Sequence, residues 1–151
     1  MAYPSRLSSG EHTATPPSAL TAQDSDERSA NADLGLARMT RANVLLVGPE
    51  RQVERIVSVH LPEANAGLVI RCQDGLPRLP PASSQGVMLL RDVDFLTPQE
   101  QRRLLEWLDA PGNRIQVVST AATHPLLLVA AGAFNEALYY RLNTVYIDLS
   151  E

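Results

Sequence analysis

The chain has 151 residues, a hydrophobic fraction of 44% and a formal net charge of −4 at pH 7. This length accommodates one packed domain and a tail, and the acidic charge argues against direct binding to DNA, whose phosphates attract a basic surface. No apolar run is long enough to span a membrane and no signal peptide is evident, so we expect a cytoplasmic protein without a membrane partner. Cys72 is the only cysteine, which excludes an intrachain disulfide, and the three histidines are too widely spaced to indicate a metal site.

Residues 1–40 are rich in Ser, Thr, Ala, Pro, Asp and Glu and contain few large aliphatic side chains. Such a segment buries too little apolar surface to offset the entropy of ordering its backbone. The composition therefore predicts a disordered N-terminal tail over residues 1–40, with at most a short helix over residues 33–38. Residues 41–151 are expected to form the folded core. The tail is interpreted as a solubilising segment, with a docking arm as the alternative.

Short apolar runs alternate with amphipathic segments through the rest of the chain. Continuous apolar runs predict buried strands at residues 44–47 and 87–90, and further strands are expected at residues 68–70, 115–118 and 144–147. Helices are expected after Pro49, after the capping box that Thr97 and Glu100 form around Pro98, and at residues 126–131 and 136–142. Prolines in residues 74–85 indicate a loop. This alternation predicts an α/β fold, with a mostly parallel sheet in a three-layer arrangement.

Residues 132–143 read Gly-Ala-Phe-Asn-Glu-Ala-Leu-Tyr-Tyr-Arg-Leu-Asn. This run resembles Gly-x-Phe-Arg-x-Asp-Leu-Tyr-Tyr-Arg-Leu-Asn in the AAA+ domain of bacterial activators that act on sigma-54 RNA polymerase. The resemblance extends over about residues 43–149 and implies a P-loop NTPase-like core. The chain stops before the helical lid of that family, and residues 72–86 are too few to hold the insertion whose Gly-Ala-Phe-Thr-Gly-Ala loop contacts sigma-54. We therefore expect a truncated core that lacks the lid.

The segment after the first strand corresponds to the phosphate-binding loop of the family. Such a loop uses several glycines, whose backbone N–H groups surround the phosphates, followed by a lysine. Aligned with Gly-Glu-Ser-Gly-Thr-Gly-Lys-Glu, the segment from Gly48 keeps only that glycine, Pro49 removes a donor, and Glu54 stands at the lysine position. The pattern predicts an ordinary turn from strand to helix.

Residues 86–96 resemble the Walker B segment Gly-Thr-Leu-Phe-Leu-Asp-Glu-Val-Asp-Glu-Leu of the family. Arg91 stands where the resemblance implies a magnesium-binding aspartate, and Asp92 stands in place of the catalytic glutamate, while Asp94 is retained. A guanidinium cannot bind Mg²⁺. Asp92 and Asp94 are therefore interpreted as catalytic remnants, and Gly48, Glu54 and Arg91 as remnants of a cofactor site. ATP and Mg²⁺ are implied by the resemblance alone, and we expect neither to bind in the ordinary way.

Glu54 and Arg91 reverse the charges of two positions that are neighbours in the family fold. We predict that they form an ion pair where nucleotide would otherwise lie, with the charged groups within about 6 Å of each other. The alternative is that each charge is solvated independently.

Two further family positions are altered. Ala122 stands where the resemblance implies the sensor asparagine, and Asn135 replaces the first of two arginines that reach the neighbouring subunit's nucleotide site. Arg141 retains the second arginine. It is interpreted either as a residue that acts in a partner's site or as one half of an ion pair on the helix surface.

These observations favour a non-catalytic regulatory module in sigma-54-type bacterial transcription regulation. The expected partner is a protein, either an AAA+ activator or a second copy of this chain, bound through the subunit interface around Tyr139, Tyr140 and Arg141. The alternative is a residual or partner-completed ATPase subunit that uses Asp92, Asp94 and Arg141. A decayed gene product without a selected role is a third interpretation.

Overall fold

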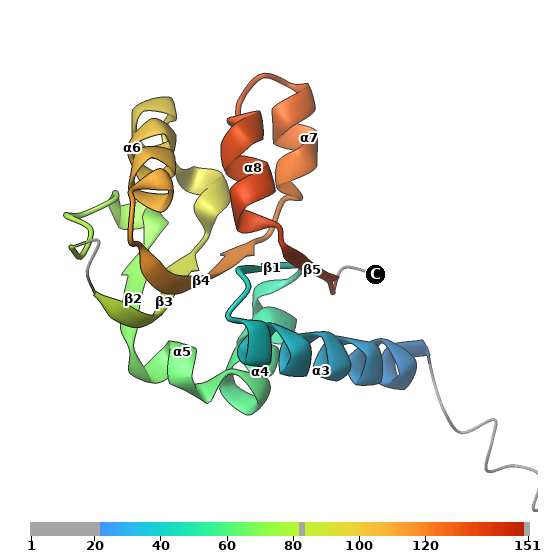
Figure 1. The fold of residues 1–151 in the computed structure, drawn as a ribbon. Helices are drawn as coiled ribbons and strands as arrows, with labels where there is room; N and C mark the ends of the chain where they lie inside the picture. The colour runs from blue at the N-terminus through green and yellow to red at the C-terminus, as the bar shows by residue number, and fades with distance from the viewer. Residues whose placement is uncertain (1–21, 82–83, 150–151) are drawn as a thin grey trace, which may run out of the picture. The chain divides into compact units, whose positions relative to one another are not determined.

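The computed structural model describes residues 22–81 and 84–149, in which α-helices lie on both faces of a five-stranded sheet (Figure 1). The strands are β1 (Val44–Val47), β2 (Leu68–Arg71), β3 (Gln85–Arg91), β4 (Arg114–Ala121) and β5 (Val145–Asp148). The helices are α3 (Ala22–Thr40), α4 (Glu50–His60), α5 (Pro62–Ala66), α6 (Pro98–Asp109), α7 (Pro125–Ala130) and α8 (Glu136–Leu142). Two 3₁₀ turns, η2 (Cys72–Asp74) and η3 (Val93–Phe95), follow β2 and β3.

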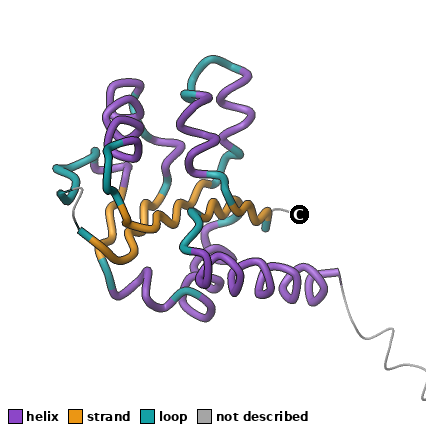
Figure 2. Tube along the Cα trace, in the orientation of Figure 1, coloured by secondary structure: helices purple, strands orange, loops and turns teal. Residues whose placement is uncertain are grey.

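The strands lie in the order β2-β3-β4-β1-β5, and every neighbouring pair is parallel. The sheet runs through the middle of the fold, between α4 and α5 on one face and α6, α7 and α8 on the other (Figure 2). This arrangement confirms the predicted three-layer α/β fold. In the register, Val47 lies beside Ala121, and Leu90 lies beside Ser119. The carboxyl ends of β1, β3 and β4 therefore meet at one edge of the sheet.

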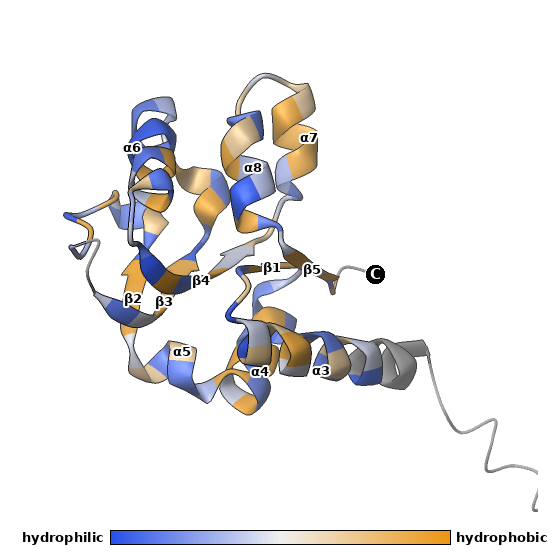
Figure 3. Ribbon diagram, in the orientation of Figure 1, coloured by the Kyte–Doolittle hydropathy of each residue, from blue (hydrophilic) through white to orange (hydrophobic). Residues whose placement is uncertain are grey.

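Both faces of the central strands are buried in β1 and in the second halves of β3 and β4, as expected for a parallel sheet covered by helices, whereas Leu68 and Val69 of the edge strand β2 are exposed. The four residues of β1 are at most 2% exposed, and their alternate side chains point to opposite faces. Leu45 and Val47 belong to a core cluster that includes Leu104 of α6 and Leu138 of α8. Apolar residues are concentrated in the strands and along α7 (Figure 3). The apolar runs at residues 44–47 and 87–90 thus lie in interior strands, whereas the run at 68–70 lies in the edge strand β2.

All five predicted strands and the predicted helices after residue 49 are present, with ends that differ by a few residues. The capping box is confirmed: Glu100 N–H donates to Thr97 Oγ1 at 3.2 Å, and Thr97 N–H donates to Glu100 Oε1 at 2.9 Å. Sequence analysis did not predict α5. This five-residue helix buries only Ala64, so it has no apolar period by which a pattern could identify it.

The prediction of disorder was wrong for Ala22–Thr40, which form α3. The short helix expected at residues 33–38 lies in the C-terminal half of this longer one. Of the described residues, 22–32 belong to a separate unit from 33–149, and within the second unit Leu34 and Ala37 are buried. Gln116 Nε2 donates to the carbonyls of Ala37 at 3.1 Å and Ala42 at 2.7 Å, which satisfies carbonyls around the end of the helix. Tertiary packing therefore orders a sequence of weak helical signal, and residues 1–21 lie outside the described residues.

Across the described ranges, no helix is both long and apolar enough to cross a membrane. The expectation of a cytoplasmic location stays a prediction.

Candidate functional site at the carboxyl edge of the sheet

The sequence-predicted remnants of the nucleotide site gather where β1, β3 and β4 end. Gly48 follows β1, Glu54 lies in the second turn of α4, and Arg91 ends β3. Asp92 and Asp94 follow immediately, with Asp94 inside η3. Ligands of open α/β sheets bind outside the carboxyl ends of the strands. This edge is therefore the place at which to test whether ATP and Mg²⁺ fit.

The connection from β1 to α4 consists of only Gly48 and Pro49. Gly48 N–H donates to the carbonyl of Ala121 at 3.0 Å, so this donor is used within the sheet edge, and Pro49 has no N–H to offer. The chain also contains no lysine. A phosphate-binding loop requires several free backbone N–H groups and a lysine. The segment therefore departs from a phosphate-binding loop in its length and in its lack of a lysine, and it is the short strand-to-helix turn that the sequence predicted.

Glu54 and Arg91 form the predicted ion pair, although they are 37 residues apart in sequence. Arg91 Nη2 donates to Glu54 Oε1 at 3.1 Å, and Arg91 Nη1 pairs with Glu54 Oε2. The same Nη2 donates to Asn65 Oδ1 at 3.3 Å. The Arg91 side chain is only 12% exposed and that of Glu54 37%, so the pair is partly shielded from water. The alternative of two independently solvated charges is wrong, and the pair joins β3 to α4 and α5.

Asp92 adopts a left-handed backbone conformation, with φ 61° and ψ 53°. This conformation costs about 1 kcal/mol in a residue other than glycine, although aspartate tolerates it better than most. Asp92 N–H donates to Thr120 Oγ1 at 3.1 Å, and Asp92 Oδ2 accepts from Gln73 Nε2 at 2.9 Å. The carboxylate that stands in place of the catalytic glutamate is therefore bound to η2 of its own chain.

Asp94 is held by the segment that follows β4. Its Oδ2 accepts from Thr123 N–H at 3.1 Å, while Oδ1 is buried without a hydrogen-bond partner among the described residues. Burial raises the pKa of Asp94, and the hydrogen bond from Thr123 opposes this shift. Within the described residues, no group of three His, Cys, Asp or Glu side chains is placed to hold a metal ion. Asp92 and Asp94 are therefore both engaged by groups of their own chain.

Cys72 lies beside these carboxylates and is 1% exposed. Burial, followed by the charges of Asp92, Glu100 and Asp94, raises the pKa of its thiol to about 12. A thiol with such a pKa is not a nucleophile at neutral pH. Cys72 is therefore a core residue of this edge.

The residues predicted for partner binding differ in exposure along α8. Tyr139 is only 6% exposed, and its hydroxyl accepts from Asn143 Nδ2 at 2.8 Å, so the prediction that it contributes to an interaction surface is wrong. Its helical position turns it into the core cluster, together with Leu138 and Leu142. Tyr140 is 61% exposed and stays a candidate for partner contact.

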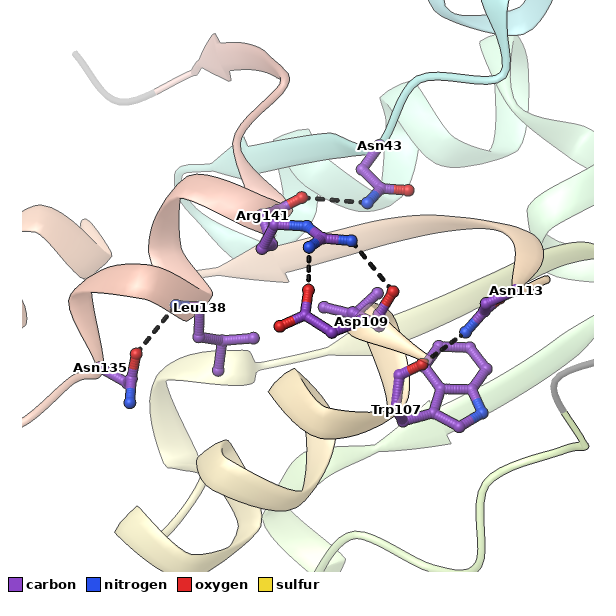
Figure 4. A network of polar contacts seen from close by, with 8 residues as sticks. Asn43, Trp107, Asp109, Asn113, Asn135, Leu138 and Arg141 are labelled. Atoms are coloured by element: carbon purple, nitrogen blue, oxygen red, sulfur yellow. Dashed lines mark hydrogen bonds and ion pairs between the residues drawn. The ribbon is translucent and has the colours of Figure 1, made fainter. Parts of the chain in front are cut away.

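Arg141 forms the helix-surface ion pair that was one of its two interpretations. Its Nη1 pairs with Asp109 at the end of α6, and its Nη2 donates to the carbonyl of Leu108 at 3.0 Å (Figure 4). The backbone carbonyl of Arg141 accepts from Asn43 Nδ2 at 3.0 Å. These contacts join α8 to α6 and to the start of β1, and they hold the guanidinium against its own chain.

Sequence analysis missed a polar network that positions α8. Gln101 is 3% exposed, and its Nε2 donates to the carbonyls of Leu96 at 2.9 Å and Ala133 at 3.1 Å. Its Oε1 accepts from Asn135 N–H at 2.7 Å, and Asn135 Oδ1 in turn accepts from Leu138 N–H at 2.9 Å, capping α8. An asparagine directly before a predicted helix is an N-cap signal. The residue that replaces the family's first arginine therefore has a structural role here.

Comparisons with known proteins agree with this fold. A family model described as the sigma-54 interaction domain matches residues 28–151. NtrX from Brucella abortus, solved in complex with ATP, is similar with a TM-score of 0.64 and 14% identity, over 82% of this chain and 35% of that chain. The P-loop NTPase domain of the sigma-54 transport activator from E. coli gives a TM-score of 0.58 and 17% identity, over 82% of this chain and 94% of that chain.

The Thermotoga maritima RuvB Holliday junction branch migration motor is also similar, with a TM-score of 0.55 and 15% identity, over 84% of this chain and 45% of that chain. At these identities, the likeness to solved structures shows the fold alone. This chain spans about a third of the length of the NtrX chain. No curated protein matches the chain. The family match nevertheless covers most of the sequence, and the chain therefore belongs to the sigma-54 interaction domain family, with the α/β fold of a P-loop NTPase-like AAA+ module.

Proposed function

We propose that this chain is a non-catalytic regulatory module that acts by protein–protein interaction in sigma-54-type bacterial transcription regulation. Family membership supports the connection to sigma-54. The observation that carries the non-catalytic part is the Glu54–Arg91 ion pair, which lies at the edge where nucleotide would bind. The expected partner is an AAA+ activator or a second copy of this chain, in the cytoplasm.

Energetics support the exclusion of Mg-ATP. Micromolar binding requires about 8 kcal/mol of free energy. A nucleotide at this edge would bring its phosphates near Glu54, and a like-charge contact near 4 Å opposes binding by about 1–4 kcal/mol at effective dielectric constants between 80 and 20. Attraction of phosphate to Arg91 would first require opening the existing pair. The two-residue connection after β1 supplies no set of free N–H groups to offset these costs.

The competing proposal, a partner-completed ATPase, receives less support because its three residues are already engaged. Gln73 bonds to Asp92, Thr123 bonds to Asp94, and Asp109 pairs with Arg141. Each of these contacts would have to open before the residue could serve a nucleotide. A subunit without a working site could instead lower the activity of a ring into which it inserts.

The first test is calorimetric titration of the full chain with ATP and ADP, with and without Mg²⁺. We expect no binding at millimolar nucleotide, and micromolar binding would contradict the proposal. The double variant Glu54→Lys with Arg91→Asp is the matched control, because it restores the family's charges while keeping the short turn after β1. We expect the control to remain unable to bind; binding by this variant alone would show that the charges, and not the turn, exclude nucleotide.

The second test concerns the partner. The chain is titrated into an active AAA+ ring of a sigma-54 activator, and the ATPase rate of the ring is measured. We expect the rate to fall as the chain is added. An unchanged rate at a large excess of the chain would contradict the proposed action on activators.

A further inference from the structure

A pocket of about 960 Å³ lies at the amino edge of the sheet, opposite the Glu54–Arg91 pair. Four adjacent strands, β3, β4, β1 and β5, begin at this pocket. The side chains that matter for its chemistry are Arg41, Asn43, Gln85, Arg114, Tyr140 and Arg141. None of the remnants of the nucleotide site lines it.

The pocket is cationic although the chain as a whole is acidic. Its lining contains three arginines and no Asp or Glu. Arg141 is partly neutralised by its pair with Asp109. Arg114 is exposed, and its side chain makes no hydrogen bond or ion pair with the described residues, so its charge is unpaired there. A concave cationic surface on a chain of net charge −4 selects an anionic ligand.

Arg41 provides a second, independent observation. It follows the last residue of α3 and has a φ of 63°, in the left-handed region. Ala42 N–H donates to the carbonyl of Ala37 at 3.2 Å, which is the bond that closes a helix of this type, and glycine usually occupies the position of Arg41 in it. The Arg41 side chain donates from Nη2 to the carbonyl of Gly86 at 2.9 Å, across the pocket mouth. The backbone therefore carries an unfavourable conformation at a residue whose side chain lines the pocket.

The dimensions of the pocket favour an extended ligand. Neighbouring strands lie about 4.8 Å apart, so four adjacent strand starts span about 14 Å, which matches about four extended residues. The pocket volume also falls in the range of ligand-binding clefts. Tyr140 is 61% exposed and offers an apolar ring beside the arginines. Asn43 is already bonded to Arg141 and to Val117, and Arg141 to Asp109 and Leu108. The main recognition groups are therefore Arg114 and Arg41, of which Arg41 uses one of its five N–H donors on Gly86.

We infer that this pocket binds an acidic peptide segment of a protein partner, with carboxylates held by Arg114 and Arg41 and an apolar side chain packed on Tyr140. Arginine binds carboxylates with two parallel hydrogen bonds, which gives geometric specificity as well as attraction. The inference rests on the proposed function for the kind of partner. The pocket at the amino edge is separate from the Glu54–Arg91 pair at the carboxyl edge, where nucleotide binding is tested.

The test is fluorescence anisotropy with the full chain and a labelled peptide, Gly-Glu-Asp-Leu-Glu-Gly. The matched control peptide carries Gln and Asn in place of Glu and Asp. We expect saturable binding of the acidic peptide, weakened by added salt, and no binding of the neutral one. Arg114→Gln should weaken binding about three- to tenfold, whereas Arg102→Gln, an exposed arginine of α6 outside the pocket, should leave it unchanged.

Equal binding of the two peptides, or equal weakening by both arginine variants, would overturn the inference. Tripolyphosphate and unlabelled acidic peptide are then compared as competitors of the labelled peptide. If tripolyphosphate displaces the labelled peptide at the lower concentration, the inference is overturned in favour of a phosphate ligand. The ring ATPase assay separates the two proposals. If the peptide binds but the ATPase rate of the ring is unchanged, the pocket remains a peptide site and the proposed action on activators is wrong. If the ring is inhibited but the peptide does not bind, the proposed action stands and the assignment of the pocket is wrong.

Discussion

The two edges of the sheet differ in how their arginines are used. At the carboxyl edge, Arg91 is nearly buried and bonded to Glu54 and Asn65. At the amino edge, Arg114 is exposed and has no bonded partner within the described residues. An arginine that is paired inside the chain contributes to the stability of the fold and is not available to a ligand. An exposed arginine contributes little to stability and retains its capacity for an external anion.

The same contrast extends to the aspartates. Asp92 and Asp94 stand in the segment that resembles Walker B, and both accept hydrogen bonds from their own chain. The pocket at the amino edge contains no acidic side chain. At the carboxyl edge, Arg91, Asp92 and Asp94 are therefore bonded within the chain, while the Arg114 side chain at the opposite edge has no partner among the described residues.

Replacing Arg91 with alanine should destabilise the fold by about 1–3 kcal/mol, a value between those of exposed and buried ion pairs. The loss arises because Glu54 is left partly shielded and without its partner, and Asn65 also loses its bond. Denaturant unfolding followed by circular dichroism measures the effect. Arg114→Ala is the control at the other edge and should change stability by less than about 0.5 kcal/mol. Equal losses in the two variants would remove the contrast between the edges.

Arg41→Gly should be more stable than Arg41→Ala by about 0.5–1 kcal/mol. Both variants lose the bond to the carbonyl of Gly86, but only glycine relieves the left-handed backbone conformation. The two unfolding free energies are compared under identical conditions. Both variants should also bind the acidic peptide more weakly than the wild type. If the alanine variant were the more stable, Arg41 would carry no strain in the folded chain.

Asp94→Asn and Glu100→Gln should change the pH dependence of stability in opposite directions. Burial raises the pKa of Asp94, so its folded form binds a proton more readily than its unfolded form, and stability is lost as pH rises through the folded pKa. Hydrogen bonds from the N–H groups of Thr97 and Leu76 lower the pKa of Glu100, so its contribution is lost as pH falls through the folded pKa.

The measurement is the free energy of unfolding of each protein from pH 3 to pH 7. The difference in unfolding free energy between the wild type and Asp94→Asn should favour the wild type most at the acidic end of this range. The difference between the wild type and Glu100→Gln should favour the wild type most at the neutral end. Parallel curves for all three proteins would show that neither carboxyl is perturbed in the folded chain.

The elements that the sequence predicted correctly are those whose signals are local. The apolar run at residues 44–47 marks β1, and the capping box at Thr97 marks the start of α6. The twelve-residue run at 132–143 identifies the family, because a match of that length does not depend on packing. Where the local signal is weak, prediction failed: α3 and α5 are held mainly by burial of Leu34, Ala37 and Ala64.

The Glu54–Arg91 pair was predicted because the resemblance supplied a spatial relation between two distant positions. No such relation was available for Asp109, which captures Arg141 from another helix, or for Gln101, which reaches the loop before α8. Tyr139 and Tyr140 are adjacent in sequence, yet one is buried and the other exposed, because successive helical residues point about 100° apart.

From the sequence alone follow the five strands, the helices after residues 49, 97, 125 and 135, the family, and the presence of Glu54 and Arg91 where the resemblance implies a lysine and an aspartate. Local hydrophobic periodicity and residue chemistry are sufficient for these conclusions. The tertiary structure was needed to show that Glu54 and Arg91 are bonded to each other and that Asp92 and Asp94 accept hydrogen bonds from their own chain. It was also needed to show that Arg41 and Arg114 line a pocket at the opposite edge. These features join residues that are far apart in the chain, so they depend on strand register and helix packing, which no local pattern specifies.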